Sequence, residues 1–315
     1  MLISNLFLCK KAILTKKFFP FLISYLAFNC AFSQVPNIAY QTPQVYTTNA
    51  TISPLIVNNT GGAIPPNIYG DVSTFAGSGQ NSFLNGISTT ASFSGPVFLT
   101  FDPQGNLYVA DPGNNAVRKI TPNATVSTFA GTGASGKQNG SANTATFNYS
   151  VGVAADALGN IFVADQNNNL IRKITPTGMV STFAGNDATG KNNGAGTSAS
   201  FNSPYGMAFD SKGNLYIADE GNNIIRKVTP VGIVSTFAGS GAQGKQDGTG
   251  TAASFYSPVD VTIDSKDNLY VDDHGHSIIC KITPGDAIAT YAGGGLDDTD
   301  NATLSTIYFT GGSRS

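Results

Sequence analysis

The sequence predicts an all-β protein assembled from tandem copies of one four-stranded antiparallel unit. Three observations lead to this prediction: a repeat with a constant 54-residue step, a composition rich in Gly and poor in charge, and turn residues between short apolar runs. Charged residues make up 11% of the chain and hydrophobic residues 41%, which excludes the profile of a disordered protein. The 315 residues are compatible with one large domain.

The first 33 residues form a segment of a different kind. Its basic residues are Lys10, Lys11, Lys16 and Lys17. An apolar run follows at 18–32, and Ala31 and Ser33 supply the small residues of a cleavage site. Because the run is shorter than the roughly 20 residues of a spanning helix, we expect a signal peptide over 1–33. The protein is then secreted or on the cell surface, with no membrane insertion after signal removal.

Removing this leader changes the charge and the cysteine inventory. The chain carries 17 basic and 19 acidic residues, and loss of the four leader lysines leaves 13 against 19, a formal net charge of −6. A mildly acidic chain without basic clusters argues against nucleic acid as a partner. Cys9 and Cys30 belong to the leader, so Cys280 is the one cysteine expected in the mature chain, which then has no internal disulfide.

Residues 34–70 precede the repeats and differ from them in composition. The stretch ISPLIVNNTGGAIPP at 52–66 is rich in Thr, Asn and Pro. We expect a linker or the remnant of an immunoglobulin-like module, because about 35 residues are too few for a stable independent domain. The predicted organisation is therefore a signal peptide at 1–33, a linker at 34–70 and repeats at 71–315.

The repeat is the strongest pattern in the chain. The motif VSTFAG, or its variant IATYAG, places an aromatic residue every 54 positions, at Phe75, Phe129, Phe183, Phe237 and Tyr291. A second aromatic position follows the same step, at Phe93, Phe147, Phe201, Phe255 and Phe309. An aspartate does so as well, at Asp111, Asp165, Asp219 and Asp273. A constant period without insertions is the signature of a repeat architecture.

Each copy contains four short strands. In the third copy we expect strands a, b, c and d over residues 204–210, 214–219, 223–229 and 232–238. Gly213 lies in the turn between a and b, and Pro230 and Gly232 lie in the turn between c and d, where such residues favour tight turns. A repeated unit of four antiparallel strands is typical of a β-propeller blade.

These residues resemble a known family. The string GNLYVAD, followed by NNxxIRKITPxGxVSTFAG, is similar to the NHL repeat, and the similarity covers residues 71–315. The resemblance implies a β-propeller, six-bladed in its complete form, from a bacterial secreted or surface protein. The fourth copy departs from the pattern at Asp267, Ser277 and Cys280, where the other copies have Gly, Asn and Arg.

The strand count leaves one strand over. Residues 71–76 have the pattern of a d strand without strands a, b and c before it, while Phe309 aligns with Phe255 where a further copy would begin. Either the chain is part of a longer propeller, or four blades close alone and the extra strand packs outside. We expect the first arrangement, because the extra strand is like its siblings and an unclosed array exposes blade faces.

Two glycine-rich patterns do not predict a cofactor site. Gly131, Gly133 and Gly136 match the spacing of the dinucleotide fingerprint and, with Lys137, nearly match a phosphate loop. Both motifs require a helix after the glycines, and the phosphate loop needs Ser or Thr where Gln138 stands. We expect ordinary loops between blades and no cofactor.

The fourth copy holds the residues nearest to a metal site. His274 and His276 lie beside Asp273 in the turn between strands b and c, and imidazole and carboxylate are good zinc ligands. A propeller enzyme would need ligands from several blades, which one loop does not supply. We therefore expect no metal at these residues.

Asp260 is also unusual, because the other copies have Phe98, Gly152 and Gly206 at its position. We expect it to face the central channel. A single carboxylate forms no catalytic pair, so no catalytic residue is predicted.

The aspartate and the asparagine that flank each b–c turn are the candidate ligand-face residues. They are Asp111, Asn115, Asp165, Asn169, Asp219 and Asn223. We expect a structural role, in which Asx side chains satisfy backbone groups of the turn, with direct ligand contact as the alternative. If Asp and Asn pair across the hairpin, Arg118 lies opposite Tyr108 and stacks on it, whereas Cys280 lies opposite Tyr270 and the stacking is lost.

The b–c turns and the d–a loops emerge at the same end of each blade. Loops such as residues 131–146 are polar and longer than the usual connection of about 4–6 residues, and such loops are often functional. We expect a non-catalytic binding or scaffold module for a protein or glycan. The alternative is a metal-dependent propeller enzyme of the lyase or lactonase type.

Overall fold

The computed structural model describes residues 38–39, 58–59 and 73–293. The chain divides into two compact units, residues 1–72 and 73–315. In the first unit, β1 (Ile38–Ala39) pairs antiparallel with β2 (Asn58–Asn59). The predicted signal peptide and most of the predicted linker lie outside the described residues.

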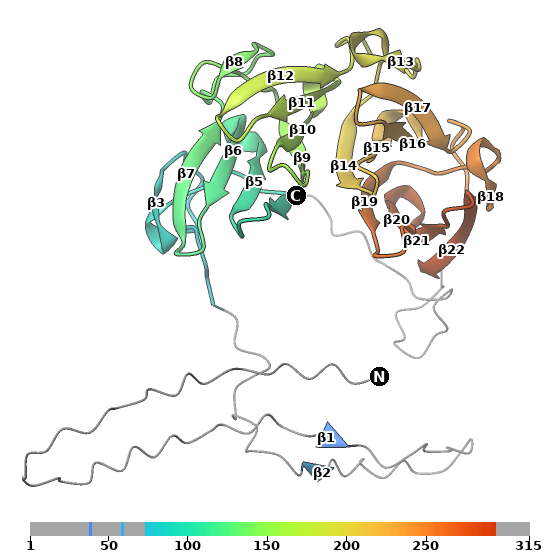
Figure 1. Ribbon diagram of the computed structural model, residues 1–315, viewed down its shortest axis with the longest axis horizontal. Helices are drawn as coiled ribbons and strands as arrows, with labels where there is room; N and C mark the ends of the chain where they lie inside the picture. Colours follow the sequence, from blue (N-terminus) through green and yellow to red (C-terminus); the bar gives the residue numbers. More distant parts are fainter. Residues whose placement is uncertain (1–37, 40–57, 60–72, 294–315) are drawn as a thin grey trace, which may run out of the picture. The chain divides into compact units, whose positions relative to one another are not determined.

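Residues 73–293 form four antiparallel sheets, each of five strands (Figure 1). The first blade contains β3 (Gly86–Ile87), β4 (Leu99–Phe101), β5 (Leu107–Asp111), β6 (Ala116–Ile120) and β7 (Thr125–Ala130). The second contains β8 (Gly140–Ser141), β9 (Ser150–Ala155), β10 (Ile161–Asp165), β11 (Leu170–Ile174) and β12 (Met179–Ala184). The third contains β13 (Gly194–Ala195), β14 (Pro204–Phe209), β15 (Leu215–Asp219), β16 (Ile224–Val228) and β17 (Ile233–Ala238). The fourth contains β18 (Gly248–Thr249), β19 (Pro258–Ile263), β20 (Leu269–Asp273), β21 (Ile278–Ile282) and β22 (Ala287–Gly293).

The prediction of an all-β fold with four propeller blades is confirmed. The helical turns in the described residues are short 3₁₀ segments, and no described helix has the length and apolar character needed to span a bilayer. Figure 1 shows the four blades following one another in chain order, with β9, β14 and β19 on their inner side. These inner strands contact one another across the blade boundaries.

The fifth strand of each blade was not predicted. It is a two-residue segment in the long loop before strand a, and it pairs with the outer strand of its own blade, as Gly140 does with Val180. A two-residue strand is too short to leave an alternation pattern in the sequence. Each long loop therefore belongs to the blade that follows it.

The predicted extra strand at 71–76 is not formed in its described part. Residues 73–76 have no strand assignment, and 71–72 lie outside the described residues. The physical reason is that the strand predicted here has no c strand beside it to complete its backbone hydrogen bonds. Ala76 nevertheless packs against the core of the first blade, at the position that Ala130 occupies one repeat later.

The boundaries between blades are apolar. Phe162 of the second blade meets Phe209 of the third in an edge-to-face contact, with 5.1 Å between ring centroids, and Met207 and Leu215 join the same cluster. Burying one large apolar side chain stabilises the fold by about 1.5–3 kcal/mol. A boundary with several such residues holds neighbouring blades together.

The first blade has an open face at the corresponding boundary. Leu99 is 59% exposed, whereas its equivalents Val153, Met207 and Val261 are 5%, 6% and 2% exposed. Phe101, two residues along the same strand, is also exposed. This apolar face has no preceding blade within the described residues.

This difference predicts unequal costs for the same truncation. Met207→Ala should lower the free energy of unfolding by about 2–5 kcal/mol because it leaves a cavity between two blades. Leu99→Ala should lower it by less than about 1 kcal/mol, as expected of an exposed side chain. Urea denaturation of the two variants measures both values, and equal costs would show that Leu99 is covered in solution.

Candidate functional site

The aspartates predicted at the b–c turns lie in the interior of the blades. Asp111, Asp165 and Asp219 end strands β5, β10 and β15, and each is fully buried. Each forms an ion pair with an equally buried arginine of the next strand; the pairs are Asp111–Arg118 at 2.9 Å, Asp165–Arg172 at 2.8 Å and Asp219–Arg226 at 3.0 Å. The arginines were not predicted to be buried.

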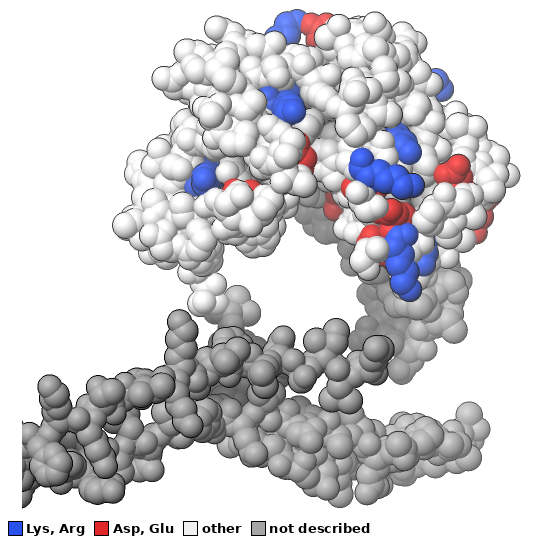
Figure 2. Space-filling view, in the orientation of Figure 1, with Lys and Arg blue, Asp and Glu red and all other residues white. Residues whose placement is uncertain are grey.

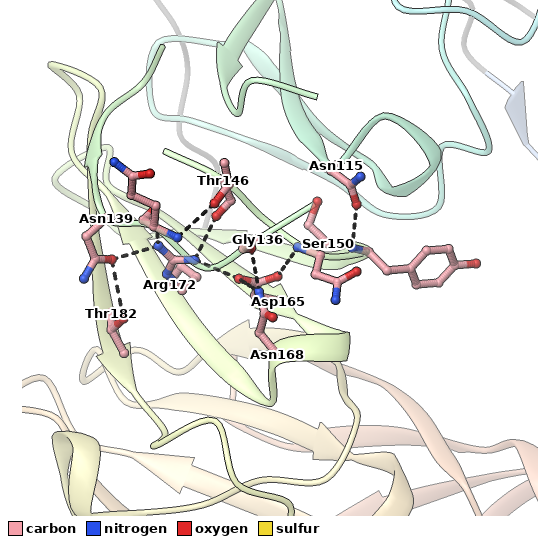
Figure 3. A network of polar contacts seen from close by, with 12 residues as sticks. Asn115, Gly136, Asn139, Thr146, Ser150, Asp165, Asn168, Arg172 and Thr182 are labelled. Atoms are coloured by element: carbon pink, nitrogen blue, oxygen red, sulfur yellow. Dashed lines mark hydrogen bonds and ion pairs between the residues drawn. The ribbon is translucent and has the colours of Figure 1, made fainter. Parts of the chain in front are cut away.

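The second blade shows how the carboxylate is used (Figure 3). The backbone N–H of Asn148 donates to Oδ1 of Asp165 at 2.7 Å. The side-chain amide of Asn168 and Nη1 of Arg172 donate to Oδ2, both at 2.8 Å. A carboxylate has about four acceptor sites, and three of those on Asp165 are filled from within the blade.

The guanidinium of Arg172 holds the long loop in place (Figure 3). It donates to the carbonyls of Thr146 and Gln138, both at 3.1 Å, and to Oδ1 of Asn139 at 2.7 Å. Its Nε has no hydrogen-bond partner, but the guanidinium carbon lies 5.3 Å from the ring centroid of Phe147. A buried charge needs several such partners because its desolvation is costly.

The asparagines of the same turns connect neighbouring blades. Asn115, Asn169 and Asn223 adopt left-handed backbone conformations at the end of each turn. Their Oδ1 atoms accept hydrogen bonds from backbone N–H groups of the following blade; the donors are Tyr149 at 2.9 Å, Ser203 at 2.9 Å and Ser257 at 2.8 Å.

These contacts support a structural role for the six candidate ligand-face residues. Their carboxylate and amide oxygens are used within blades or between them, and the aspartates offer no surface to a ligand. Burial raises the pKa of Asp219 to about 6, so this carboxylate is still ionised at neutral pH and pairs with Arg226.

The predicted register of the b–c hairpin is wrong by one residue. Tyr108 lies opposite Lys119, not opposite Arg118, because Asp111 pairs with Ala116. The turn holds one more residue than expected, and a one-residue shift moves every side chain to the other face of the strand. The lysine, not the arginine, therefore covers the tyrosine ring, with 5.6 Å between Nζ of Lys119 and the ring centroid.

The predicted loss of this stacking in the fourth blade is also wrong. Tyr270 lies opposite Lys281, whose Nζ is 5.5 Å from the ring centroid. Cys280 instead occupies the position of the buried arginine and is itself buried. Burial raises the pKa of its thiol to about 12, so at neutral pH it is not the thiolate that a nucleophile requires.

In the fourth blade the buried aspartate has no arginine partner, and a histidine stands at the position of the turn asparagine Asn222. Asp273 is fully buried, accepts the backbone N–H of Tyr256 at 2.6 Å and lies 2.8 Å from Nδ1 of His276. The ring of His276 packs edge-on against that of Tyr256. Burial raises the pKa of Asp273, and the contact with His276 opposes this shift.

A carboxylate pair, missed in the sequence, lies in the same blade. Asp260 of β19 is directly opposite Asp272 of β20 in the ladder. Burial, with the nearby charge of Asp272, raises the pKa of Asp260 to about 6; burial also raises the pKa of Asp272, against the effect of His274. The signal in the sequence was Asp272 itself, since the other copies have Ala at this position.

The structure does not bring the suggested metal ligands together. Asp273 and His276 are in contact, whereas His274 is exposed. Among the described residues, no three His, Cys, Asp or Glu side chains are grouped so that they could hold a metal ion. Asp260 and Asp272 remain an acidic pair with one neighbouring imidazole.

Comparison with known proteins gives partial matches. The family model described as alkaline phosphatase PhoX matches residues 137–262, less than half of the chain. Protein SUPPRESSOR OF QUENCHING 1, chloroplastic, from Arabidopsis thaliana is 30% identical over 169 residues, which cover 49% of this chain and 16% of the relative. The chain thus corresponds to a small part of that protein.

Solved structures are similar at low identity. A catalytically inactive variant of virginiamycin B lyase from Staphylococcus aureus, crystallised with quinupristin, is 16% identical with a TM-score of 0.44, over 62% of this chain and 55% of that one. An auxiliary nutrient binding protein from Bacteroides ovatus is 16% identical with a TM-score of 0.49, over 67% of this chain and 52% of that one. The chain spans about half the length of these structures, and similarity at this level assigns neither protein's function to it.

The buried ion pair predicts a large effect of removing its cation. Arg172→Met should lower the free energy of unfolding by about 3–5 kcal/mol, because Asp165 would keep a buried charge without its partner. Lys173→Met, at the next residue, should cost about 1 kcal/mol or less, since it removes only a partly exposed cation–π contact. Urea denaturation measures both, and a cost below about 1 kcal/mol for Arg172→Met would contradict the role assigned to the pair.

The raised pKa of Asp260 predicts a pH dependence. Its carboxyl titrates near pH 6 in the folded chain and near 3.8 when unfolded, so the stability it contributes is fully present below pH 3.8 and is lost as the pH rises towards 6. Between pH 3.8 and 6 the free energy of unfolding of the wild type should therefore fall by about 1–3 kcal/mol through this group. Asp260→Asn, which cannot titrate, should not show this fall.

Denaturation at a series of pH values tests this expectation. Asp187→Asn, which changes an exposed carboxylate, is the control and should keep the wild-type slope. If Asp260→Asn and the wild type have the same slope between pH 4 and 6, the carboxyl of Asp260 does not titrate there.

Proposed function

We propose that this chain is an NHL-type propeller protein, exported through its leader, that serves as a non-catalytic binding or scaffold module for a protein or glycan. The observation that carries this proposal is the repeated cluster of buried aspartate and arginine. In the first three blades these charged groups are fully buried, and they bond to one another and to the backbone of the long loops. Recurrent polar residues whose hydrogen bonds are used up inside the blades indicate that they support the loop surface and do not take part in catalysis.

The surface that these clusters support is the end of each blade with the b–c turns and the long loops. Side-chain amides of the turns donate to loop carbonyls, at 3.0 Å from Asn114 to Ser82, 2.8 Å from Asn168 to Gly136 and 2.8 Å from Asn222 to Gly190. Loops already fixed in this way lose little conformational freedom on binding.

Two tyrosines give this end its aromatic anchors. Tyr149 and Tyr256 are exposed and stand just before the inner strands of the second and fourth blades. Aromatic side chains of this kind carry much of the energy of binding surfaces. Figure 2 shows one face of the described residues, most of which is neither basic nor acidic.

Binding of the full chain to a printed glycan array and to a panel of purified extracellular proteins tests the proposal. The double variant Tyr149→Ala, Tyr256→Ala should weaken any interaction at least about tenfold. Met179→Gln changes an exposed residue next to a c–d turn and should leave it unchanged. If the double tyrosine variant binds with the affinity of the wild type, the binding surface is not at this end of the blades.

The second candidate is a metal-dependent propeller enzyme of the lyase or lactonase type. The observation in its favour is the acidic pair of the fourth blade, Asp260 and Asp272, with His274 beside it. Metal analysis of the full chain discriminates between the two functions. A stoichiometric divalent ion that is lost in the double variant His274→Ala, His276→Ala would favour the enzyme; the activity assays should then include a lactone and, given the description of the matching family model, a phosphate ester.

A further inference from the structure

A pocket of about 320 Å³ lies between the second and third blades, at the end that carries the a–b and c–d turns. Its lining includes Asp156, Leu158, Phe162, Phe183, Phe209 and Lys212. The rings of Phe183 and Phe209 stand edge-to-face against Phe162, at centroid distances of 4.9 and 5.1 Å. The pocket thus combines an aromatic floor with charged groups at its edge.

The second blade lacks one hydroxyl group that the other three possess. Tyr108, Tyr216 and Tyr270 each direct a phenol hydroxyl at the aspartate of the a–b turn; the acceptors are Asp102 at 3.2 Å, Asp210 at 3.4 Å and Asp264 at 3.3 Å. The second blade has Phe162 at this position. Its aspartate, Asp156, is therefore without this donor.

The remaining contacts of Asp156 match those of its counterparts. Oδ1 accepts the backbone N–H groups of Leu158 and Asn160, at 2.9 and 2.8 Å, and Oδ2 accepts the side-chain amide of Asn160 at 2.7 Å. In the first blade the same three contacts are present together with the tyrosine hydroxyl. Oδ2 of Asp156 therefore retains capacity for one more hydrogen bond, and Asp156 lines the pocket.

A second departure of the second blade lies at the same place. Leu158 is 80% exposed at the tip of the a–b turn, where the other blades have a polar residue. The equivalents are Gln104, Lys212 and Lys266. An exposed leucine at the rim extends the apolar wall of the pocket towards solvent.

The next boundary, between the third and fourth blades, is closed by contacts that the pocket lacks. There Asp267 accepts both the backbone N–H of Ser211, at 2.9 Å, and its hydroxyl, at 2.6 Å, so the two a–b turns are joined. At the boundary between the second and third blades the equivalent of Asp267 is Gly213, which has no side chain to form this bridge. Two substitutions and one missing bridge thus coincide at a single boundary.

We propose that this pocket binds one sugar unit of a carbohydrate, whose hydroxyl replaces the missing tyrosine hydroxyl on Asp156. A pyranose ring presents an apolar C–H face, which suits the wall formed by Leu158 and the phenylalanines, and hydroxyl donors at its rim. A hydroxyl that donates to a carboxylate makes a strong, charge-assisted hydrogen bond. Lys173 and Lys212 line the same pocket and donate to other sugar oxygens.

Other ligand chemistries fit this pocket less well. An anion would meet the lysines but also the carboxylate of Asp156, which would be left without its donor. A purely apolar ligand would desolvate Oδ2 without supplying a hydrogen bond, and an unpaired buried acceptor is costly. The volume of 320 Å³ is at the lower end of the range for small-molecule sites, about 300–1,000 Å³, which suits a single ring or a disaccharide.

This site is separate from the surface of the proposed function. It lies at the end of the blades with the a–b and c–d turns, whereas Tyr149 and Tyr256 precede strand a at the opposite end. Loss of binding in the tyrosine variant and loss of binding at this pocket are therefore distinguishable.

Saturation-transfer NMR of the full chain with methyl glycosides of glucose, galactose, mannose and N-acetylglucosamine tests the inference. At least one glycoside should bind to the wild type. Phe162→Tyr restores the residue of the other three blades and fills the vacant acceptor site, so it should weaken that binding at least about tenfold while the fold is retained. Leu158→Lys, a second return to the repeat pattern, should weaken it as well.

Tyr216→Phe is the matched control, because it removes the equivalent hydroxyl from the third blade and should leave glycoside binding unchanged. Thermal denaturation shows whether each variant is folded. The inference is overturned if no glycoside binds to the wild type, if toluene binds and the glycosides do not, or if folded Phe162→Tyr and Leu158→Lys both bind as the wild type does.

Discussion

A guanidinium enclosed beneath each long loop is the interaction on which the first three blades depend. It joins the end of strand b to backbone carbonyls of a loop more than 25 residues earlier in the chain, as Arg172 does with Thr146 and Gln138. A long loop outside a regular strand pairing has few backbone N–H groups nearby to donate to its carbonyls. The ion pair with Asp165 keeps the cation in place, and the Phe147 ring covers the part of the guanidinium that has no hydrogen bond.

The fourth blade shows which features require this interaction and which do not. With Cys280 in place of the arginine, its b–c ladder keeps the register of the other blades. Its loop is held differently: Asp247 accepts the backbone N–H of Thr290 at 3.0 Å, and His276 approaches the buried Asp273. The strands are therefore fixed by backbone pairing and apolar packing, while the buried charge serves the loops.

The repeat pattern was sufficient to predict the blades, because apolar alternation and turn residues recur at every 54th position. It was insufficient for features that depend on the exact length of a turn, because one additional residue shifts the strand register. The left-handed Asn115 lengthens the b–c turn by one residue, which turned Arg118 inward and Lys119 towards Tyr108. The pairing of Asp260 with Asp272 follows from the same ladder and could not be seen without it.

The chain segment that forms one blade begins at the glycine after the d strand, not at strand a. Residues 131–184 contain all five strands of one sheet, and residues 185–238 contain all five of the next. A cut at Gly131 or Gly185 thus separates whole sheets, whereas a cut before strand a would leave a short outer strand with the wrong blade. Recombination or gene design that inserts a copy at these glycines adds a self-contained module, and the turn asparagine then supplies its hydrogen bond to the new neighbour.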